Sequence, residues 1–477
     1  MVYCRESAAI SSRIDPFCFR YILGFIPCFP FRMEMGPCST QDMLNNLPES
    51  ILENIFSRLS MRDVVRTSVL STKWRYKWIS IPHLIFNDEC IPVSNGSLHH
   101  NKLVKIINHV LLLHRGPILT FKICSSQLQT CPEIESWILY LSSNSLTKFE
   151  LQVSKSERHI VPPRLFSFRQ LIHLKLVGCV IVPPVSFKGF SCLTSLVFQK
   201  VTLSDPTLKC LVSTCPQLER LTLIDIDGPI LIELSNPKLK YLHIYGEFIA
   251  MCLKDLRLLD YARFYATTVA RPDQRRTCNI SNILGSLLGI QKLVMGGWFL
   301  QVIKPCDFHI YSAIGTQSFT FTFAFILLQS LAVDDVPRRL PSTYDHLKSI
   351  SLPLNAKDMK EILVAIYLLN SSPNLQELEI LLWHNRDSAI VPVMDLQKAK
   401  DQLKSTFNKL RVVKFSKLFG MEIELVLIRF ILANSPVLET MNIIPRKNGI
   451  EELLLKQLLQ FERASPLAEV VCLDPET

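Results

Sequence analysis

Apolar residues recur along most of this chain in a short motif, LxxLxL, whose first, fourth and sixth positions are leucine or another apolar residue. The end of each motif alternates as a β-strand does, so the fourth and sixth side chains are predicted to point inward and the third and fifth outward. The first position is expected to pack inward from the approach to the strand. Ten motifs begin at Leu146, Leu171, Leu193, Leu218, Leu239, Ile290, Leu347, Leu375, Leu410 and Leu438.

The spacing of these motifs predicts the architecture. The first four intervals are 25, 22, 25 and 21 residues, within the range of about 20 to 29 residues expected of leucine-rich repeats. Between motifs the apolar period becomes helical, so each unit is predicted to be one strand and one helix or helical turn. Such units must stack into a curved solenoid with parallel strands along one side, because none can bury its apolar face alone. Coincidental apolar triplets in an ordinary α/β domain are the competing interpretation.

Two long intervals interrupt the repeats. The 51 residues from Leu239 to Ile290 contain a weak candidate for a degenerate unit at Leu256 and Leu259. The 57 residues that follow contain SFTFTFAFILL, a β-prone run unlike the repeat. The predicted solenoid therefore covers residues 100–400, with an irregular stretch at 301–346.

A different pattern predicts three short amphipathic helices within residues 42–86. Apolar residues of the first helix, which follows Pro48, have helical spacing: Ile51, Leu52, Ile55, Phe56 and Leu59. Ser60 and Asp63 resemble a capping box at the start of the second helix. Trp74 and Trp78 are four residues apart and share one face of the third. Because three such helices bury little core of their own, an exposed apolar face for a partner is expected.

The motifs LPxxILxxIFSRL and RDVVRTSVLSxxWRxxW in this segment resemble the F-box. The resemblance implies a docking module without an active site, which binds a Skp-type adaptor and through it a cullin scaffold and a ubiquitin-conjugating enzyme. A plain helical N-terminal bundle is the alternative. Transferred position by position, the adaptor contacts that the resemblance implies are Leu47, Pro48, Ile51, Leu52, Ile55, Val64, Val65, Leu70, Trp74 and Trp78.

The C-terminal region carries a second resemblance. LRVVKFSKLFGMEIELVLIRFILANSPVLETMNI, followed by FERASPLAEVVCLD, is similar to the FBD region that ends a large plant F-box/leucine-rich-repeat family. Residues 401–477 are assigned to this region, with a closing strand around Val470 and Val471 that caps the solenoid. The expected fold is α/β: a short all-α three-helix F-box, then an irregular leucine-rich-repeat solenoid capped by an FBD-like C-terminal region.

Composition limits the possible partners. The 477 residues are 48% hydrophobic and can bury a large core. Their net charge of +10 is scattered, with no long basic block and no recognition motif, so nucleic-acid binding is not expected. No apolar run approaches the length of about 20 residues that a membrane span needs.

The cysteine pattern predicts the cellular compartment of the protein. None of the 15 cysteines forms a CxxC pair or a zinc-ligand spacing with His, which indicates small core residues in a reducing compartment. We therefore expect the nucleus and/or the cytoplasm. Residues 1–41 lack periodicity and are expected to be disordered; a natural start at Met33, Met35 or Met43 is a second interpretation.

Catalytic chemistry is disfavoured. The sequence contains no GxGxxG, GxxxxGK[ST], HExxH or GxSxG motif, so no enzyme, cofactor or metal site is expected. His99 and His100 are expected in a solvated loop, because no further metal ligand lies at suitable spacing. Cys131 and Cys215 are expected to be structural.

A binding surface is expected where the outward-facing strand positions line the concave face of the solenoid. The early positions are mostly basic and aromatic, and the later ones turn acidic: His173, Lys175, Arg220, Thr222, Tyr241, His243, Tyr245, Lys292, Glu377 and Glu379. Taken with these positions, the resemblance to the F-box/leucine-rich-repeat family implies the substrate-recognition subunit of an SCF-type (Skp–cullin–F-box) ubiquitin ligase. The alternatives are a non-ligase interaction scaffold, a degenerate family member, or a small-molecule receptor, which would need a pocket on this face.

Overall fold

A computed structural model describes residues 47–69, 74, 76–91, 97–154, 158–228, 231–248, 250–267, 286–297, 343–355, 365, 368–383, 406–446 and 456–473. The predictions for residues 1–41, for Leu70 and for SFTFTFAFILL lie outside these residues. The chain divides into two compact units, Met1–Leu203 with Thr214–Gln217 and Ser204–Ser213 with Leu218–Thr477. Among the described residues, no helix combines the length and apolar content that a membrane span requires.

The first unit begins with two of the three predicted helices. Helix α3 (Glu49–Phe56) starts directly after Pro48. Helix α4 (Met61–Arg66) starts at Ser60, whose Oγ accepts a hydrogen bond from the amide of Asp63 at 3.4 Å. A short 3-10 helix follows at η2 (Thr67–Val69).

The third predicted helix differs from expectation in its described part. Trp74 lies in a turn, and Trp78 lies in a 3-10 helix, η3 (Lys77–Ser80), instead of an α-helix. Pro82 explains where this helix stops, because the residue before a proline avoids the α conformation. Ile81 accordingly has extended backbone angles, φ −68° and ψ 135°.

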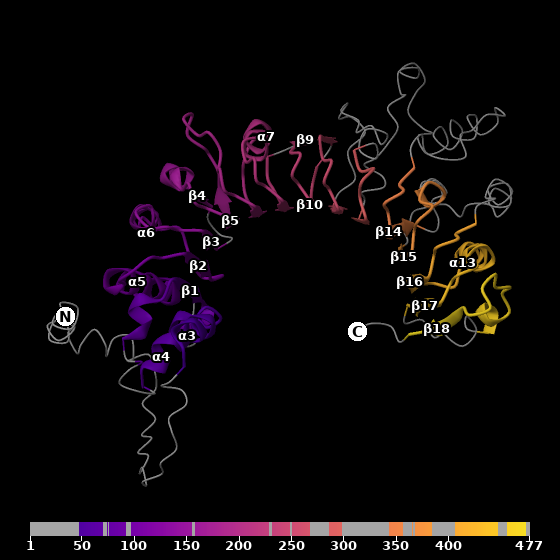
Figure 1. Cartoon of the computed structure of the whole chain (residues 1–477), viewed down its shortest axis with the longest axis horizontal. Helices are drawn as coiled ribbons and strands as arrows, with labels where there is room; N and C mark the ends of the chain where they lie inside the picture. Colours follow the sequence, from indigo (N-terminus) through magenta and orange to yellow (C-terminus); the bar gives the residue numbers. More distant parts are fainter. Residues whose placement is uncertain are drawn as a thin grey trace, which may run out of the picture. The chain divides into compact units, whose positions relative to one another are not determined.

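The sheet of the first unit is parallel throughout, with its strands in chain order (Figure 1). Its strands are β1 (His83–Asn87), β2 (Thr120–Cys124), β3 (Lys148–Gln152), β5 (His173–Val177) and β7 (Ser195–Gln199). The connections contain η4 (Asp88–Cys90), α5 (Ser97–Leu113), α6 (Glu133–Leu141), η5 (Pro163–Ser167) and a small parallel pair, β4 (His159–Ile160) with β6 (Cys179–Val180). The segment predicted as all-helical F-box therefore ends in the first strand of the sheet, a correction to the predicted architecture.

In its described residues, the second unit continues the same pattern with nine parallel strands in its main sheet. These are β8 (Arg220–Ile224), β10 (Tyr241–Gly246), β12 (Tyr261–Ala266), β13 (Lys292–Gly297), β14 (Ser349–Asn355), β15 (Glu377–Trp383), β16 (Val412–Leu418), β17 (Thr440–Pro445) and β18 (Glu469–Cys472). Helices α7 (Asp205–Ser213) and α13 (Glu422–Asn434) lie to one side of these strands in Figure 1.

All ten LxxLxL motifs form strands of these sheets, as predicted. The first residue of every motif is at most 2% exposed. The fourth and sixth positions are also buried, as Leu221 and Leu223 in β8 illustrate, while the third and fifth, Arg220 and Thr222, are exposed or half-buried. The alternation arises because successive side chains of a strand point to opposite faces.

The prediction of a helix or helical turn in every repeat is wrong for the repeats that begin with β8 and β10. A second small parallel sheet, β9 (Leu231–Ser235) with β11 (Ala250–Lys254), takes the place of helices after β8 and β10. The sequence LIELS alternates in burial with a period of two, which suits a strand. The degenerate unit at Leu256 and Leu259 is confirmed: both side chains are buried immediately before β12.

The C-terminal region has the predicted closing strand. Strand β18 contains Val470 and Val471 and pairs with β17, and helix α13 continues the predicted alternation of strand and helix. Glu424, in the first turn of α13, is 1% exposed. Its Oε2 accepts hydrogen bonds from the amides of Phe419, Gly420 and Met421 at 3.0, 2.9 and 3.1 Å, which satisfies donors at the helix start.

Candidate adaptor-binding and target-binding surfaces

Helix α3 has one buried and one exposed apolar face. Leu52 and Phe56 point into the chain and are 6% and 3% exposed. Ile51 and Ile55 are 46% and 39% exposed, and Pro48 is also exposed. Positions 48, 51 and 55 have i, i+3, i+7 spacing and therefore form one stripe along the helix, which we call the α3 stripe.

The remaining candidate adaptor contacts lie mostly inside the chain. Leu47 is half-buried, and Leu70 lies outside the described residues. The side chains with the least exposure, all below 9%, are Leu52, Val64, Val65, Trp74 and Trp78. The structure thus separates the candidates into a surface group, the α3 stripe, and a buried interior group.

The interior group holds α3 in position. The rings of Phe56 and Trp74 pack edge to face, with centroids 5.7 Å apart and an interplanar angle of 88°. Lys77 donates to Oε2 of Glu49 at 2.7 Å, which links η3 to the first turn of α3. Because this pair is largely solvent-exposed, packing contributes more to the position of α3 than the ion pair does.

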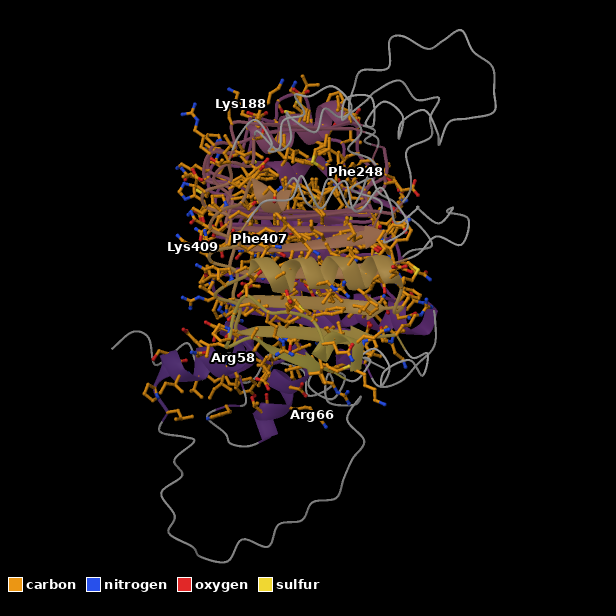
Figure 2. All side chains as sticks on the ribbon, turned by 90° about the vertical axis from the view of Figure 1, so that its right-hand side faces the viewer. Arg58, Arg66, Lys188, Phe248, Phe407 and Lys409 are labelled. Atoms are coloured by element: carbon orange, nitrogen blue, oxygen red, sulfur yellow. The ribbon has the colours of Figure 1, made fainter. Side chains whose placement is uncertain are left out.

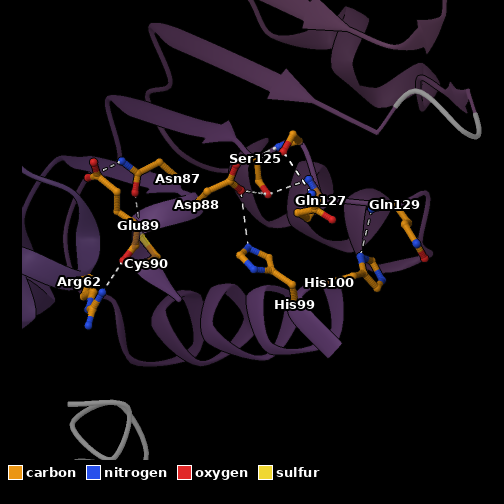
Figure 3. Close-up of polar contacts among 11 residues, drawn as sticks. Arg62, Asn87, Asp88, Glu89, Cys90, His99, His100, Ser125, Gln127 and Gln129 are labelled. Atoms are coloured by element: carbon orange, nitrogen blue, oxygen red, sulfur yellow. Dashed lines mark hydrogen bonds and ion pairs between the residues drawn. The ribbon is translucent and has the colours of Figure 1, made fainter. Parts of the chain in front are cut away.

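Polar contacts link the helices to the start of the sheet (Figure 3). Nη1 of Arg62, in α4, donates to the carbonyl oxygen of Glu89 at 2.8 Å. Next to it, Asp88 accepts a hydrogen bond from the hydroxyl of Ser125, beyond β2, and lies 3.6 Å from Nε2 of His99 on α5. Helix α4 also contacts β1 directly. The α3 stripe therefore belongs to a module that packs onto the first strand of the sheet.

His99 and His100 do not lie in a solvated loop, which corrects the prediction. Both lie on α5; His99 is 5% exposed, and Nδ1 of His100 accepts from the amide of Gln129 at 3.1 Å. Asp88 lies between Ser125 and His99, whereas in a Ser-His-Asp triad the histidine lies between the other two. This cluster is therefore unsuited to activating Ser125.

Metal and thiol chemistry find little support in the described part of the chain. No group of three His, Cys, Asp or Glu side chains there is placed to hold a metal ion. Burial, with a smaller effect of Glu133, raises the pKa of the Cys131 thiol to about 11, so the thiol stays protonated at neutral pH. Cys215 is fully buried, although Cys192 and Cys210 are exposed, contrary to the prediction that all cysteines lie in the core.

The candidate target contacts all lie at outward-facing positions of the strands. Three are exposed, namely Arg220, Lys292 and Glu377, and the others are half-buried: His173, Lys175, Thr222, Tyr241, His243, Tyr245 and Glu379. The sheet register places Lys175 beside Glu150 in the first unit and Tyr241 beside Arg220 in the second. We call this side of each sheet the open face.

A charged cluster occupies the open face of the first unit. Nζ of Lys122 lies 3.1 Å from Oε2 of Glu150, and Nε2 of His173 lies 3.6 Å from Oε1. Burial alone would raise the pKa of Glu150, but the hydrogen bonds and charges of His173 and Lys122 outweigh it and lower the pKa to about 2.

This lowered pKa predicts a pH dependence of stability. Glu150 contributes stability above its ordinary pKa of 4.5, and that contribution is lost as the pH falls toward about 2. We expect acidification to cost wild type on the order of 1–2 kcal/mol more than Glu150→Gln, allowing for solvent screening. Denaturant midpoints across this pH range measure the loss of stability. For Lys122→Met we expect a loss between those of wild type and Glu150→Gln. Equal pH slopes for wild type and Glu150→Gln would contradict this assignment.

Comparisons with known proteins match three parts of the chain. They are the F-box domain at residues 44–85, the LRR repeats of FBD-associated F-box protein At5g56370 at 134–301, and FBD at 407–443. F-box/FBD/LRR-repeat protein At1g13570 of Arabidopsis thaliana is 34% identical over 446 residues, which cover 91% of this chain and 98% of that protein. The chain belongs to the F-box/FBD/LRR-repeat family.

Two further comparisons are more distant. Putative F-box protein At1g49610 of Arabidopsis thaliana is 27% identical over 351 residues, covering 71% of this chain and 84% of that protein. A solved LRR protein of Leptospira interrogans, LIC12759, aligns with a TM-score of 0.30 and 13% identity over 82% of this chain and 95% of that chain. That likeness is too low to support an argument. Proteins of the F-box/LRR family are typically non-catalytic adaptors.

In this F-box/FBD/LRR-repeat protein, one tyrosine-bearing strand of the open face lies outside the ten predicted motifs. Strand β12 carries Tyr261, Arg263 and Tyr265 at outward positions, in register with β10. Its sequence, LDYARF from Leu259, has apolar residues at the first, fourth and sixth positions, with alanine at the fourth. The same apolar pattern was therefore the signal that could have predicted this strand.

Proposed function

We propose that this chain is the substrate-recognition subunit of an SCF-type (Skp–cullin–F-box) ubiquitin ligase. The observation that carries the proposal is the α3 stripe in a chain of the F-box/FBD/LRR-repeat family. Contiguous exposed apolar side chains on a rigid helix suit a protein interface. An F-box implies binding to a Skp-type adaptor in general.

The two kinds of surface divide the work. The α3 stripe contacts the adaptor, and the buried side chains of Leu52, Val64, Val65, Trp74 and Trp78 set its shape from beneath. The open faces of the repeat sheets bind the target protein through rigidly held side chains. The chain breaks no bond itself; it raises the effective concentration of the target near the ubiquitin-loaded enzyme, which the cullin holds. This role places the protein in the nucleus and/or the cytoplasm.

Reconstitution tests the proposal. The purified full chain is mixed with a Skp-type adaptor and with a cullin bound to its RING partner, and complexes are separated by gel filtration. We expect the chain, adaptor and cullin to elute together. When the adaptor is left out, we expect the chain to be absent from the cullin peak. A folded chain that elutes alone would contradict the ligase role and favour the non-ligase scaffold.

A further inference from the structure

The open face of the second unit carries a continuous surface of tyrosine and arginine side chains on β8, β10 and β12. We call this the cationic tyrosine surface and define it by Arg220, Tyr241, Tyr245, Tyr261, Arg263 and Tyr265. The strand register brings these residues together, with Arg220 beside Tyr241 and Tyr241 beside Tyr261. In the described sheets, no other tyrosines lie opposite one another on neighbouring strands.

The tyrosine rings cover one another's faces. Tyr241 and Tyr261 stack with centroids 4.7 Å apart and planes 5° apart, and the guanidinium of Arg220 lies 4.2 Å from the centroid of Tyr241. Tyr245 and Tyr265 stack at 4.9 Å and 20°. Because at least one face of each ring is covered, the ring edges and hydroxyl groups are the parts that mainly remain for a ligand.

The glycine of the next strand extends this packing. The ring of Tyr265 occupies the space that a side chain at position 296 would need, so only Gly296 allows the ring to lie against β13. This close approach fixes one end of the stack. The surface is therefore a preformed array and needs little ordering when it binds.

Hydrogen-bond donors and positive charge predominate on this surface. Arg220 and Arg263 are exposed, as is Lys292 on β13, in register with Tyr261. Guanidinium and ammonium groups donate but do not accept, tyrosine hydroxyls can donate, and aromatic ring edges carry partial positive charge. Among the outward positions of β8, β10, β12 and β13, no residue is acidic.

Acidic side chains lie at the margins of these strands. At the strand starts, Glu219 pairs with Lys240 at 2.8 Å, and Asp260 is exposed. At the strand ends lie Asp225 and Glu247. Between these carboxylates the cations form a band of positive charge, with Arg220 and Lys292 at the first residues of their strands and Arg263 in the middle of β12. A bound chain with the opposite charge fits this band.

His243 lies within this band, between the two tyrosine stacks. Burial, and secondly the charge of Arg263, lower the pKa of His243. The group is therefore mostly neutral at pH 7, and Arg263 opposes its protonation. An anion bound between Arg263 and His243 would reverse that electrostatic effect.

We propose that the cationic tyrosine surface binds an Asp- and Glu-rich segment of the target protein. The inference rests on the proposed function and specifies which class of target segment the repeats recognise. From β8 to β13 the surface crosses three strand spacings, about 14 Å, which an extended peptide of about four or five residues spans. Nucleic acid fits less well, because bases bind by stacking on free aromatic faces and each of these four rings already has at least one face covered.

Peptide binding to the purified full chain tests the inference. The probe is a fluorescein-labelled peptide with six glutamates, and fluorescence anisotropy reports its affinity. The comparison probes are the same peptide with glutamine, with lysine and with phosphoserine at those positions, and a single-stranded RNA of equal charge. We expect binding of the glutamate peptide, no binding of the glutamine and lysine peptides, and weaker binding as salt is raised.

Charge reversal locates the binding site. Arg263→Glu with Lys292→Glu is expected to weaken binding of the glutamate peptide by about tenfold or more. The matched control reverses two exposed lysines elsewhere, Lys188→Glu with Lys409→Glu (Figure 2), and is expected to retain most of the affinity. Circular dichroism checks that both variants are folded. Tyr261→Phe keeps the stack with Tyr241 and tests the hydroxyl separately.

Three results would overturn the inference. They are no binding of the glutamate peptide to the folded chain, equal loss in the two charge-reversal variants, and binding of only the phosphoserine peptide or the RNA, which would assign the surface to phosphate. Adaptor binding is measured on the same preparation. Loss of peptide binding with adaptor binding intact overturns the acidic-target inference alone, whereas peptide binding without adaptor binding overturns the ligase role.

Discussion

Replacing Ile51 and Ile55 with aspartate is expected to abolish binding of the chain to a Skp-type adaptor while leaving the fold intact. Both side chains lie in the α3 stripe and are among the exposed large apolar residues. Carboxylates there would have to be desolvated at an apolar interface, so we expect affinity to fall about 100-fold or more. Because the positions are exposed, each substitution should change the free energy of unfolding by no more than about 0.5 kcal/mol. Isothermal titration calorimetry with the purified adaptor measures the loss.

A matched control separates this effect from added charge. Val182 and Val185 are also exposed apolar residues of the first unit, 60% and 108% exposed, and lie outside the F-box. Val182→Asp with Val185→Asp introduces the same charge and is expected to bind the adaptor as wild type does. Full adaptor binding by the Ile51→Asp and Ile55→Asp variant would show that the α3 stripe is not the interface. Trp74→Ala would be less informative, because Trp74 packs on Phe56 in the interior.

Removal of the Glu424 carboxylate is expected to give the largest loss of stability. Glu424→Ala leaves the amides of Phe419, Gly420 and Met421 without their acceptor in a partly buried setting. Each unsatisfied buried donor costs about 1–3 kcal/mol, so after relaxation and water entry we expect a total loss of about 2–4 kcal/mol. The denaturant midpoint of the transition that includes α13 measures it.

Two further substitutions test the cause of this loss. Glu424→Gln retains one side-chain oxygen as an acceptor and is expected to cost about half as much or less. Glu422→Ala removes an exposed carboxylate from the same helical turn and is expected to cost at most about 1 kcal/mol. Equal losses for Glu424→Ala and Glu422→Ala would show that helix-terminus charge, and not the buried hydrogen bonds, is responsible.

Most strands of the repeat sheet could be predicted from the apolar motif. All ten LxxLxL motifs form strands because the motif encodes both the period of two and the inward first residue. Strands β1, β2 and β12 lie outside the ten predicted motifs although they obey the same rule. Their first, fourth and sixth positions are also apolar: Ile81, Leu84 and Phe86; Ile118, Phe121 and Ile123; Leu259, Ala262 and Phe264.

The candidate adaptor surface could be predicted only as a set of apolar residues. Ile51 and Leu52 are neighbours with similar hydrophobicity, yet one is 46% exposed and the other 6%. The difference depends on which side of α3 faces the interior. That side is set by the packing of Phe56, in α3, on Trp74, which lies in a later element of the chain. Helical periodicity identifies a face that is too wide to say which part remains exposed.

The candidate target surface depended on register. Tyr241 and Tyr245 could be predicted as outward-facing from their own strand, but their stacking partners Tyr261 and Tyr265 come from β12, which lacks the full leucine motif. The buried environment of His99 likewise depends on Asp88, from a different element. Contacts between distant segments depend on the register in which the strands pair, and a local apolar pattern does not specify that register.

Amide hydrogen exchange of the full chain, with and without a Skp-type adaptor, tests whether α3 is the adaptor interface. We expect the adaptor to slow exchange in peptides that cover α3, residues 49–56, and to leave exchange in β8, β10 and β12 unchanged, because these strands bind the target. Unchanged exchange in α3 at saturating adaptor, or protection confined to the repeat strands, would show that α3 does not bind the adaptor.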